Sequence, residues 1–311
     1  MKLFRYEKTP TQIVIRILWF RINIMLKLTQ KEVLSMLNNF VDITKCPKAK
    51  GKLRALQLAD LELLKLFHDI CQKHNIEYML QFGTLIGAVR HKGYIPWDDD
   101  LDLIVFSTSY EKLLNILEEE LKETDLTIYG IEKTRLGNDF LRISHKNFPS
   151  LNLDISYIHP SELHYEQKNK IKKIWDYHHF KYYCLFRFFV KFFENRNLLK
   201  KFRKEINSHF EKEIVACDID NANIFVDLVA DVFFVLKKEW VYPLKLMQFE
   251  NYQFYVPNNP DKVLREFYGD YMSFPKSLVH HGSIFSNFDE DEIIEVTEYL
   301  KKLDKKILNL T

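Results

Sequence analysis

Four aspartates crowd into residues 98–102 of this sequence, where they begin an apolar stretch from Leu101 to Phe106. Carboxylates this close repel one another, so they cannot all remain ionised in a buried site unless a cation binds them. The apolar stretch predicts a strand, and the alternation of side chains along a strand places Asp100 and Asp102 on one face of its sheet. Asp98 can join them from the preceding turn. The run therefore predicts a charged site at the start of a buried strand.

The residues before and after the acidic run alternate between helical and extended patterns. Leu56, Leu63, Phe67 and Ile70 recur at steps of seven, four and three, which predicts an amphipathic helix from Leu53 to His74. Further strands are predicted at residues 76–82, 126–131, 140–144, 151–158 and 252–256, and further helical segments at residues 85–90, 109–122, 160–213 and 293–307.

This order of elements predicts an α+β fold, a mixed β-sheet flanked by helices. Only eight of the 311 residues are glycine, which argues against a turn-rich all-β fold, and a hydrophobic content of 47% is ample for a packed core. We expect a basic helical N-terminal extension at residues 1–50, one main domain at residues 51–288 and a C-terminal helix at residues 289–311. A basic, aromatic helical insertion is expected within the domain, at residues 160–215.

A further aspartate, Asp154, stands alone among apolar neighbours in the predicted strand 151–158. If this strand lies beside the first one, its carboxylate joins those of Asp98, Asp100 and Asp102. Hard oxygen ligands of this kind suit Mg²⁺ or Mn²⁺, which neutralise phosphate oxygens during group transfer. The alternative interpretation of the acidic run is a solvated turn.

The dipeptide Gly83-Thr84 lies between a predicted strand and a short predicted helix. Backbone N–H groups at the start of a helix can hold a phosphate, and the threonine hydroxyl can assist them. Arg90 and Lys92 follow the same helix, and we interpret them as groups that neutralise phosphate, the alternative being a solvated basic loop. The ordered set of strand, Gly-Thr pair, acidic run and third acid predicts a site for a phosphate compound and a divalent cation.

The cysteines and the N-terminal apolar stretch bear on the compartment. The four cysteines form no CxxC pair and match no zinc-binding spacing, which predicts reduced thiols in a cytoplasmic protein. The stretch from Ile13 to Leu28 is interrupted by Arg16, Arg21 and Lys27, so its uncharged runs are too short to span a membrane. We also expect no signal peptide.

Two segments are strongly basic: residues 1–31 carry a net charge of +6 and residues 168–204 one of +10, while the whole chain carries +2. The aromatic helical pattern of the second segment fits either a buried helical hairpin or a helix that lies on an anionic membrane surface. No known nucleic-acid-binding module accompanies these charges and the site region is acidic, so we expect no nucleic acid partner. The expected location is the cytoplasm, with peripheral attachment to the inner face of the plasma membrane as an option.

Residues 83–102 resemble the hallmark of the LicD/fukutin family, a branch of the nucleotidyltransferase superfamily. They read Gly-Thr-Leu-Ile-Gly-Ala-Val-Arg-His-Lys-Gly-Tyr-Ile-Pro-Trp-Asp-Asp-Asp-Leu-Asp, with only conservative changes from the family's pattern. Residues 249–275 are similar to the family's closing motif, although Asn251 stands where the family usually has glycine. The resemblance extends over roughly residues 53–282 and implies a nucleotidyltransferase-like fold for the main domain.

The resemblance implies a transferase that moves a phosphorylated alcohol, classically phosphocholine, from a CDP-activated donor to a hydroxyl of a glycan, with release of CMP. The glycan would be lipopolysaccharide, teichoic acid or capsule, and choline, ethanolamine, glycerol and ribitol stay open as the alcohol. By the family's motif, Asp100 and Asp102 are the metal-binding pair, Asp98 and Asp154 are further acids of the cluster, and the Gly-Thr pair lies against the donor phosphate. We also expect Asp154 to accept the proton of the acceptor hydroxyl as a general base.

Two other functions stay open. The first is true nucleotidyl transfer, in which attack at the nucleotide's own phosphorus releases pyrophosphate. The second is a non-catalytic scaffold associated with membranes, against which the intact set of acids argues. Tyr268, Gly269 and Asp270 are candidates for shaping the acceptor side of the site, and Glu250 is either a cap, a buried ion pair or a site residue.

Overall fold

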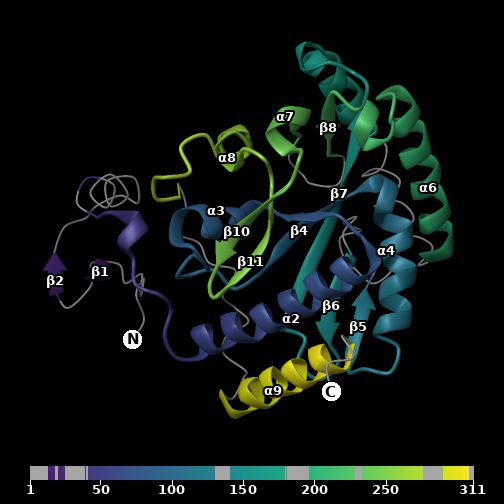
Figure 1. Cartoon of the computed structure of the whole chain (residues 1–311). Coiled ribbons are helices and arrows are strands. Elements are labelled where there is room, and N and C mark those ends of the chain that lie inside the picture. Colours follow the sequence, from purple (N-terminus) through teal and green to yellow (C-terminus); the bar gives the residue numbers. More distant parts are fainter. Residues whose placement is uncertain are drawn as a thin grey trace.

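The computed structural model describes residues 13–17, 20–24, 39, 41–129, 141–178, 180, 196–227, 233–275 and 290–307 (Figure 1). The strands are β1 (Ile13–Ile17), β2 (Phe20–Ile24), β3 (Tyr78–Leu80), β4 (Asp102–Phe106), β5 (Leu126–Tyr129), β6 (Leu141–His145), β7 (Asn152–Ser161), β8 (Ile224–Val226), β9 (Val235–Lys237), β10 (Lys245–Phe249) and β11 (Tyr252–Val256). The α-helices are α2 (Lys52–His74), α3 (Phe82–His91), α4 (Ser107–Glu120), α6 (Arg196–Glu213), α7 (Lys238–Val241), α8 (Pro260–Tyr268) and α9 (Glu290–Ile307). Short 3-10 helices are η1 (Ile43–Lys45), η3 (Tyr165–Gln167) and η4 (Ile219–Asn221), and residues 168–178 are also helical.

The central sheet has the strand order β3-β4-β7-β6-β5, and β8 and β9 extend it from the far half of β7. β4 and β7 pair in parallel, whereas β3, β5 and β6 join the sheet in antiparallel. Because β7 is ten residues long, its first half lies between β4 and β6 and its last residues pair with β8. The predicted mixed sheet and α+β class are confirmed.

The two faces of this sheet differ in burial. Leu153 and Ile155 in β7 are completely buried, whereas Asp154, on the opposite face of the strand, is only half-buried. α4 covers the apolar face, where the ring centroid of its Tyr110 lies 4.6 Å from that of Tyr157 in β7. α2 contacts both α4 and β7, so these two helices shield one face of the sheet and leave the acidic residues on the other.

The amphipathic helix predicted before the acidic run is α2. Its residues Leu56, Leu63, Phe67 and Ile70 are at most 3% exposed, as the predicted apolar face requires. Burying a side chain of this size stabilises the fold by about 2 kcal/mol. α2 lies side by side with α9 (Figure 1), which occupies residues 290–307 of the segment 289–311 where a C-terminal helix is predicted.

The closing segment of the domain packs against its opening segment. β10 and β11 form a hairpin in which Phe249 and Phe254 are completely buried, and β11 contacts β3. Pro260 occupies the first turn of α8, where the missing N–H of proline removes no helical hydrogen bond. α8 in turn contacts α3, so the closing segment reaches the helix that carries the Gly-Thr pair.

The N-terminal extension differs from the prediction. Residues Ile13–Ile17 and Phe20–Ile24 form a two-stranded antiparallel sheet, so the helix predicted there is wrong at these positions. The segment is rich in isoleucine and valine, whose β-branched side chains favour an extended backbone, and a short apolar run of this kind fits both helical and extended spacing. Residues 25–38 lie outside the described part of the chain.

The insertion predicted at residues 160–215 is helical at residues 168–178 and in α6. Ile171 and Phe210 are completely buried in one hydrophobic cluster, which favours internal packing for this part of the insertion. The most aromatic part, residues 181–195, lies outside the described residues, and the membrane-surface prediction falls largely on it.

Two smaller predictions can be compared with the described residues. Within those ranges no helix combines the length and the apolar character that crossing a membrane requires. Cys46, Cys71 and Cys217 are free thiols, as predicted, while Cys184 lies outside the described residues.

Candidate active site

The loop that carries the acids, residues 92–101, is held in place by α2. Gln57 is completely buried, and its side-chain Nε2 donates to the backbone oxygen of Asp98 at 2.9 Å and to that of Ile95 at 3.3 Å. A buried amide that bonds to two backbone oxygens fixes their positions, because breaking either bond would leave a polar atom unsatisfied. α2 therefore fixes the place of Asp98.

Glu250 holds the same loop from the other side. Its carboxylate accepts two hydrogen bonds from Arg54, at 2.8 and 2.9 Å. Burial opposes its ionisation, but the bonds from Arg54 and Lys48 hold the pKa of Glu250 at about 2. A Cβ placed on Gly93 would lie only 2.5 Å from Glu250 Oε1, so the loop can pass this close to Glu250 only with a glycine at position 93. Of the predicted alternatives for Glu250, the buried ion pair is confirmed.

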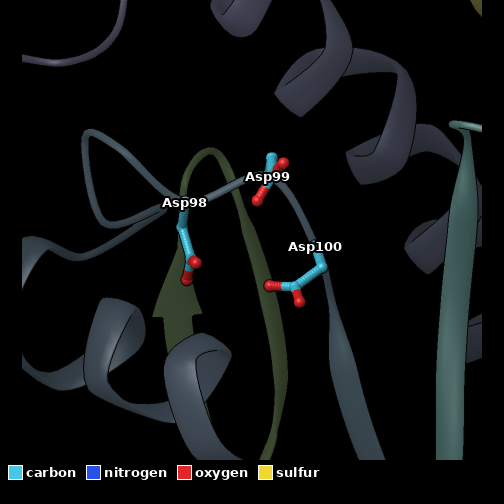
Figure 2. Close-up of side chains that lie close together, drawn as sticks. All are labelled: Asp98, Asp99 and Asp100. Atoms are coloured by element: carbon cyan, nitrogen blue, oxygen red, sulfur yellow. The ribbon is translucent and has the colours of Figure 1, made fainter. Parts of the chain in front are cut away.

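The acids meet where this loop enters the sheet. Asp98, Asp99 and Asp100 can bring carboxylate oxygens within 4.8 Å of one another, and Figure 2 shows the Asp100 side chain reaching from the loop toward Asp98. Asp102 begins β4 and is the register partner of Asp154 in the parallel strand β7, so both lie on one face of the sheet. The two strands are therefore neighbours, which is the condition for a cluster that includes the third acid.

One polar row crosses the sheet at this level. The N–H of Gln81 donates to the backbone oxygen of Asp102 at 3.0 Å, Asp102 is the register partner of Asp154, and Asp154 is that of Arg142 in β6. Arg142 Nε donates to Asp154 Oδ1 at 2.5 Å, and its Nη2 donates to Oδ2 at 2.6 Å. Arg142 thus engages both carboxylate oxygens of Asp154, in the bidentate geometry that gives the strongest ion pairs.

The Gly-Thr pair lies directly beside the acids. α3 begins at Phe82, earlier than predicted, so Gly83 and Thr84 lie in its first turn. A Cβ on Gly83 would lie 2.7 Å from Asp98 Oδ2, so the missing side chain lets this carboxylate approach the positive end of the helix. Thr84 Oγ1 accepts a hydrogen bond from the N–H of Asp102 at 2.8 Å and thereby joins α3 to β4. Contact of either residue with a phosphate stays a prediction.

The predicted cations at the end of α3 have different surroundings. The Arg90 guanidinium is buried and donates to the backbone oxygen of Tyr271 at 2.6 Å, and burial lowers its pKa to about 10. It therefore joins α3 to the closing segment. Lys92 is exposed and ends the helix with a left-handed backbone, at a φ of 54°. Within the described ranges, neither side chain donates a hydrogen bond to the acids.

The electrostatics of the cluster favour a bound cation. Burial raises the pKa of Asp98 and of Asp102 well above the usual range, and the charge of Asp100 adds to both shifts. Burial also raises the pKa of Asp154, and the hydrogen bond from Arg142 works against it. One arginine thus leaves much of the repulsion in place. Carboxylate oxygens are the ligands that Mg²⁺ and Mn²⁺ prefer, so the residues present fit the predicted ion.

Sequence reasoning missed Arg142. It stands alone among apolar neighbours in the predicted strand 140–144, as Asp154 does in the predicted strand 151–158. Two opposite charges isolated in consecutive strands are a signal that the strands pair and bring the charges together, because an isolated charge on a half-buried face requires a partner.

Asp60 in α2 was missed as well. It lies on the apolar face of the helix, between Leu56 and Leu63, and is completely buried. Burial raises its pKa well above the usual range, and the charges of Asp100 and Asp99 add to the shift. The electrostatic field of the acid cluster therefore reaches into the core beneath the loop.

Sequence comparisons relate this chain to known proteins. Residues 75–200 match the family model described as the LicD/FKTN/FKRP nucleotidyltransferase domain. The lipopolysaccharide cholinephosphotransferase LicD of Haemophilus influenzae is 45% identical over 74 residues, which are 24% of this chain and 28% of that protein. The uncharacterized protein RP689 of Rickettsia prowazekii is 36% identical over 107 residues, which are 28% of this chain and 38% of that protein.

A third relative, the uncharacterized protein RT0683 of Rickettsia typhi, is 55% identical over 42 residues, which are 14% of each chain. The chain thus spans less than two fifths of the length of the curated relatives that it matches. The family match includes the hallmark at residues 83–102 and Asp154, the third acid, and therefore the whole acid cluster. Residues 75–200 of this chain are thus similar to the LicD/FKTN/FKRP nucleotidyltransferase domain.

Proposed function

We propose that this chain transfers phosphocholine from a CDP-activated donor to a hydroxyl of a lipopolysaccharide glycan and releases CMP. The observation that carries the proposal is the meeting of Asp102 and Asp154 in neighbouring parallel strands, beside the carboxylates of Asp98 and Asp100. The activity named for the Haemophilus relative supports the choice of transferred group and acceptor.

We assign the divalent cation, Mg²⁺ or Mn²⁺, to the carboxylates of Asp98, Asp100 and Asp102. When bound, such an ion neutralises charge on the phosphate oxygens of the donor. The chain's own residues supply the positions: α2 and Glu250 fix the loop, and Gly83 leaves room for the Asp98 carboxylate at the start of α3. The N–H groups in the first turn of α3 then face the same space and can bind a donor phosphate.

The hydrogen bonds that Asp154 accepts from Arg142 bear on its role in the reaction. A hydroxyl that gives its proton to Asp154 has to compete with the two N–H donors of Arg142. We therefore propose that Asp154 is held as a fixed member of the acid cluster, and the clamp argues against its predicted role as the general base. A carboxylate has about four acceptor positions, so Asp154 can keep this clamp and still face the cation.

A donor screen with the purified full chain and Mg²⁺ tests the proposal. CDP-choline, CDP-ethanolamine, CDP-glycerol and CDP-ribitol are each incubated with a lipopolysaccharide acceptor, and released CMP and pyrophosphate are quantified. We expect CMP from CDP-choline, and a rate at least ~10²-fold lower in Asp100→Asn. Asp176→Asn, which changes an exposed acid in a helical ion pair, is the matched control and should keep the native rate.

The alternatives predict different products. Release of pyrophosphate from a nucleoside triphosphate, with no CMP from any CDP compound, would replace the proposal by nucleotidyl transfer. If the chain binds neither a divalent cation nor any CDP compound, the non-catalytic scaffold becomes the better account.

A further inference from the structure

Four aromatic side chains from three separate segments form a wall, which we call the aromatic wall: Phe82, Phe234, Phe267 and Tyr268. The ring centroids of Phe82 and Phe267 are 5.3 Å apart, and those of Phe234 and Phe267 are 4.2 Å apart, both in edge-to-face geometry. The Tyr268 ring follows at 6.2 Å from that of Phe267. These spacings are typical of packed aromatic pairs, so the four rings hold one another in place.

The aromatic wall stands beside the acid cluster. The residue before Phe82, Gln81, donates its N–H to the backbone oxygen of Asp102, and a Cβ placed on the residue after it, Gly83, would lie 2.7 Å from Asp98 Oδ2. Phe82 therefore lies between two residues that neighbour the acids. At the other end of the wall, burial raises the pKa of Tyr268, and the charges of Asp102 and Asp98 raise it further, as expected for a hydroxyl close to carboxylates.

The backbone at Phe82 shows that this placement is maintained against strain. Phe82 has a φ of 43°, in the left-handed region that a bulky residue rarely adopts. Strained positions of this kind persist only where the surrounding structure holds them, and they cluster at functional sites. Phe82 is the first residue of α3, and in this conformation its ring packs on that of Phe267.

One end of the wall is open. Phe234 is 1% exposed, whereas Tyr268 is 46% exposed, so the buried rings back an accessible one. Gly269 follows with a φ of 67°, and within the described part of the chain nothing lies within 4 Å of a Cβ placed there. The Tyr268 side chain is therefore accessible to a ligand.

The exposed ring of Tyr268 favours a positively charged ligand. An aromatic face attracts a positive charge, and quaternary ammonium groups are the ligands that such faces recognise best. A neutral polyol, such as glycerol or ribitol, gains no such attraction.

We propose that Tyr268, backed by Phe267 and Phe82, receives the quaternary ammonium group of the transferred alcohol and so selects choline over neutral alcohols. This inference rests on the proposed function, because it assigns one part of the donor to a place beside the acid cluster. It also gives Tyr268, predicted to shape the acceptor side, a role on the donor side.

The test is direct binding of phosphocholine to the full chain by isothermal titration calorimetry, with glycerol phosphate as the uncharged-alcohol probe. Tyr268→Leu keeps apolar volume but removes the ring, and should weaken phosphocholine binding roughly 2- to 30-fold, the range of a cation–π contact. Tyr268→Phe keeps the ring and should bind phosphocholine nearly as the native chain does. Glycerol phosphate should bind all three proteins equally.

Tyr177→Leu is the matched control, because Tyr177 is a tyrosine 58% exposed in the helix at residues 168–178, outside the site. Thermal unfolding of each variant shows whether the fold is kept. The inference falls if native protein does not prefer phosphocholine to glycerol phosphate, or if Tyr268→Leu binds phosphocholine as native protein does. It also falls if Tyr268→Leu weakens both probes, or CMP, to the same extent, since the ring would then serve the phosphate or the nucleobase.

The CMP-release assay separates this failure from failure of the proposed function. Release of CMP from CDP-glycerol in preference to CDP-choline would leave a phosphotransferase without an ammonium site. Absence of CMP release from every donor, with selective phosphocholine binding that depends on Tyr268, would leave the site and remove the proposed reaction.

Discussion

Arg142 hydrogen-bonds to both carboxylate oxygens of Asp154, and its removal should lower the stability of the fold measurably. The substitution Arg142→Gln removes both donors to Asp154, whose side chain is 16% exposed, and leaves Asp102 beside it in the next strand. Asp154 then sits half-buried on the sheet, next to another carboxylate, without its bidentate partner. We expect the folded state to lose stability because neither acid gains a new partner.

The magnitude follows from the exposure of the pair. Hydrogen bonds to charged groups contribute about 1.5–3 kcal/mol each when buried. The Arg142 side chain is 37% exposed, so solvent screens part of the pair's energy. We therefore expect a loss of about 2 kcal/mol in the free energy of unfolding, measured in EDTA at pH 8. Arg142→Lys keeps the charge without the planar fork and should lose about half as much.

The loss of stability in Arg142→Gln should depend on pH. Without Arg142, burial and the charge of Asp100 act on Asp154 unopposed, so its folded pKa rises further above the unfolded value. A carboxyl with a raised folded pKa loses stability as the pH rises through that pKa. The deficit of Arg142→Gln should thus be largest at pH 8 and small near pH 4.

Urea unfolding monitored by circular dichroism measures these quantities. Adding Mg²⁺ should narrow the gap between the variant and the native chain, since the ion replaces the lost positive charge at the cluster. Arg265→Gln is the matched control: Arg265 also engages both oxygens of a carboxylate, that of Asp261, but both side chains are more than half exposed, so its loss should change the free energy of unfolding far less. Equal stability of Arg142→Gln and the native chain in EDTA at pH 8 would refute the reasoning.

Two further predictions concern other positions. Gly83→Ala places a methyl group 2.7 Å from Asp98 Oδ2, so the carboxylate must move. We expect CMP release to fall at least ~10-fold while the melting temperature stays close to native. Native activity in this variant would show that the position of the Asp98 carboxylate does not matter for the reaction. Burial and the charge of Asp69 raise the pKa of Asp304 in α9 to about 6, so this group stabilises the fold increasingly as the pH falls from about 7 to 4. Asp304→Asn should flatten that dependence by about 1 kcal/mol in urea unfolding, and an unchanged pH profile would exclude the role.

The sequence predicted the core of the domain well because its signals are local. α2 was indicated by an apolar face that is indeed buried, and β4 and β7 were indicated by apolar runs that begin with or surround a single acid. The three-residue strands β8 and β9 were not predicted, because a segment this short shows no periodicity and becomes extended by pairing with β7.

The acids of the candidate site could be predicted from the sequence, but the residues that bind those acids could not. The spacing of Asp100 and Asp102 placed both on one face, but the clamp of Asp154 by Arg142 depends on which strands pair and in which register. In the aromatic wall, Phe82 contacts Phe267, although most of the domain's sequence separates the two residues. In a chain rich in phenylalanine, the local sequence gives no sign of which rings will meet. Contacts of this kind are set by tertiary packing.

The proposed function requires that the aspartates hold a divalent cation, and a titration of the native chain and of Asp102→Asn with Mn²⁺ measures whether they do. Replacing a buried carboxylate by an amide relieves repulsion, so we expect Asp102→Asn to unfold at a higher temperature than the native chain in EDTA while its Mn²⁺ affinity falls at least ~10-fold. Opposite changes in stability and affinity cannot arise from a damaged fold. Native Mn²⁺ affinity in Asp102→Asn, or no Mn²⁺ binding by the native chain, would contradict the claim.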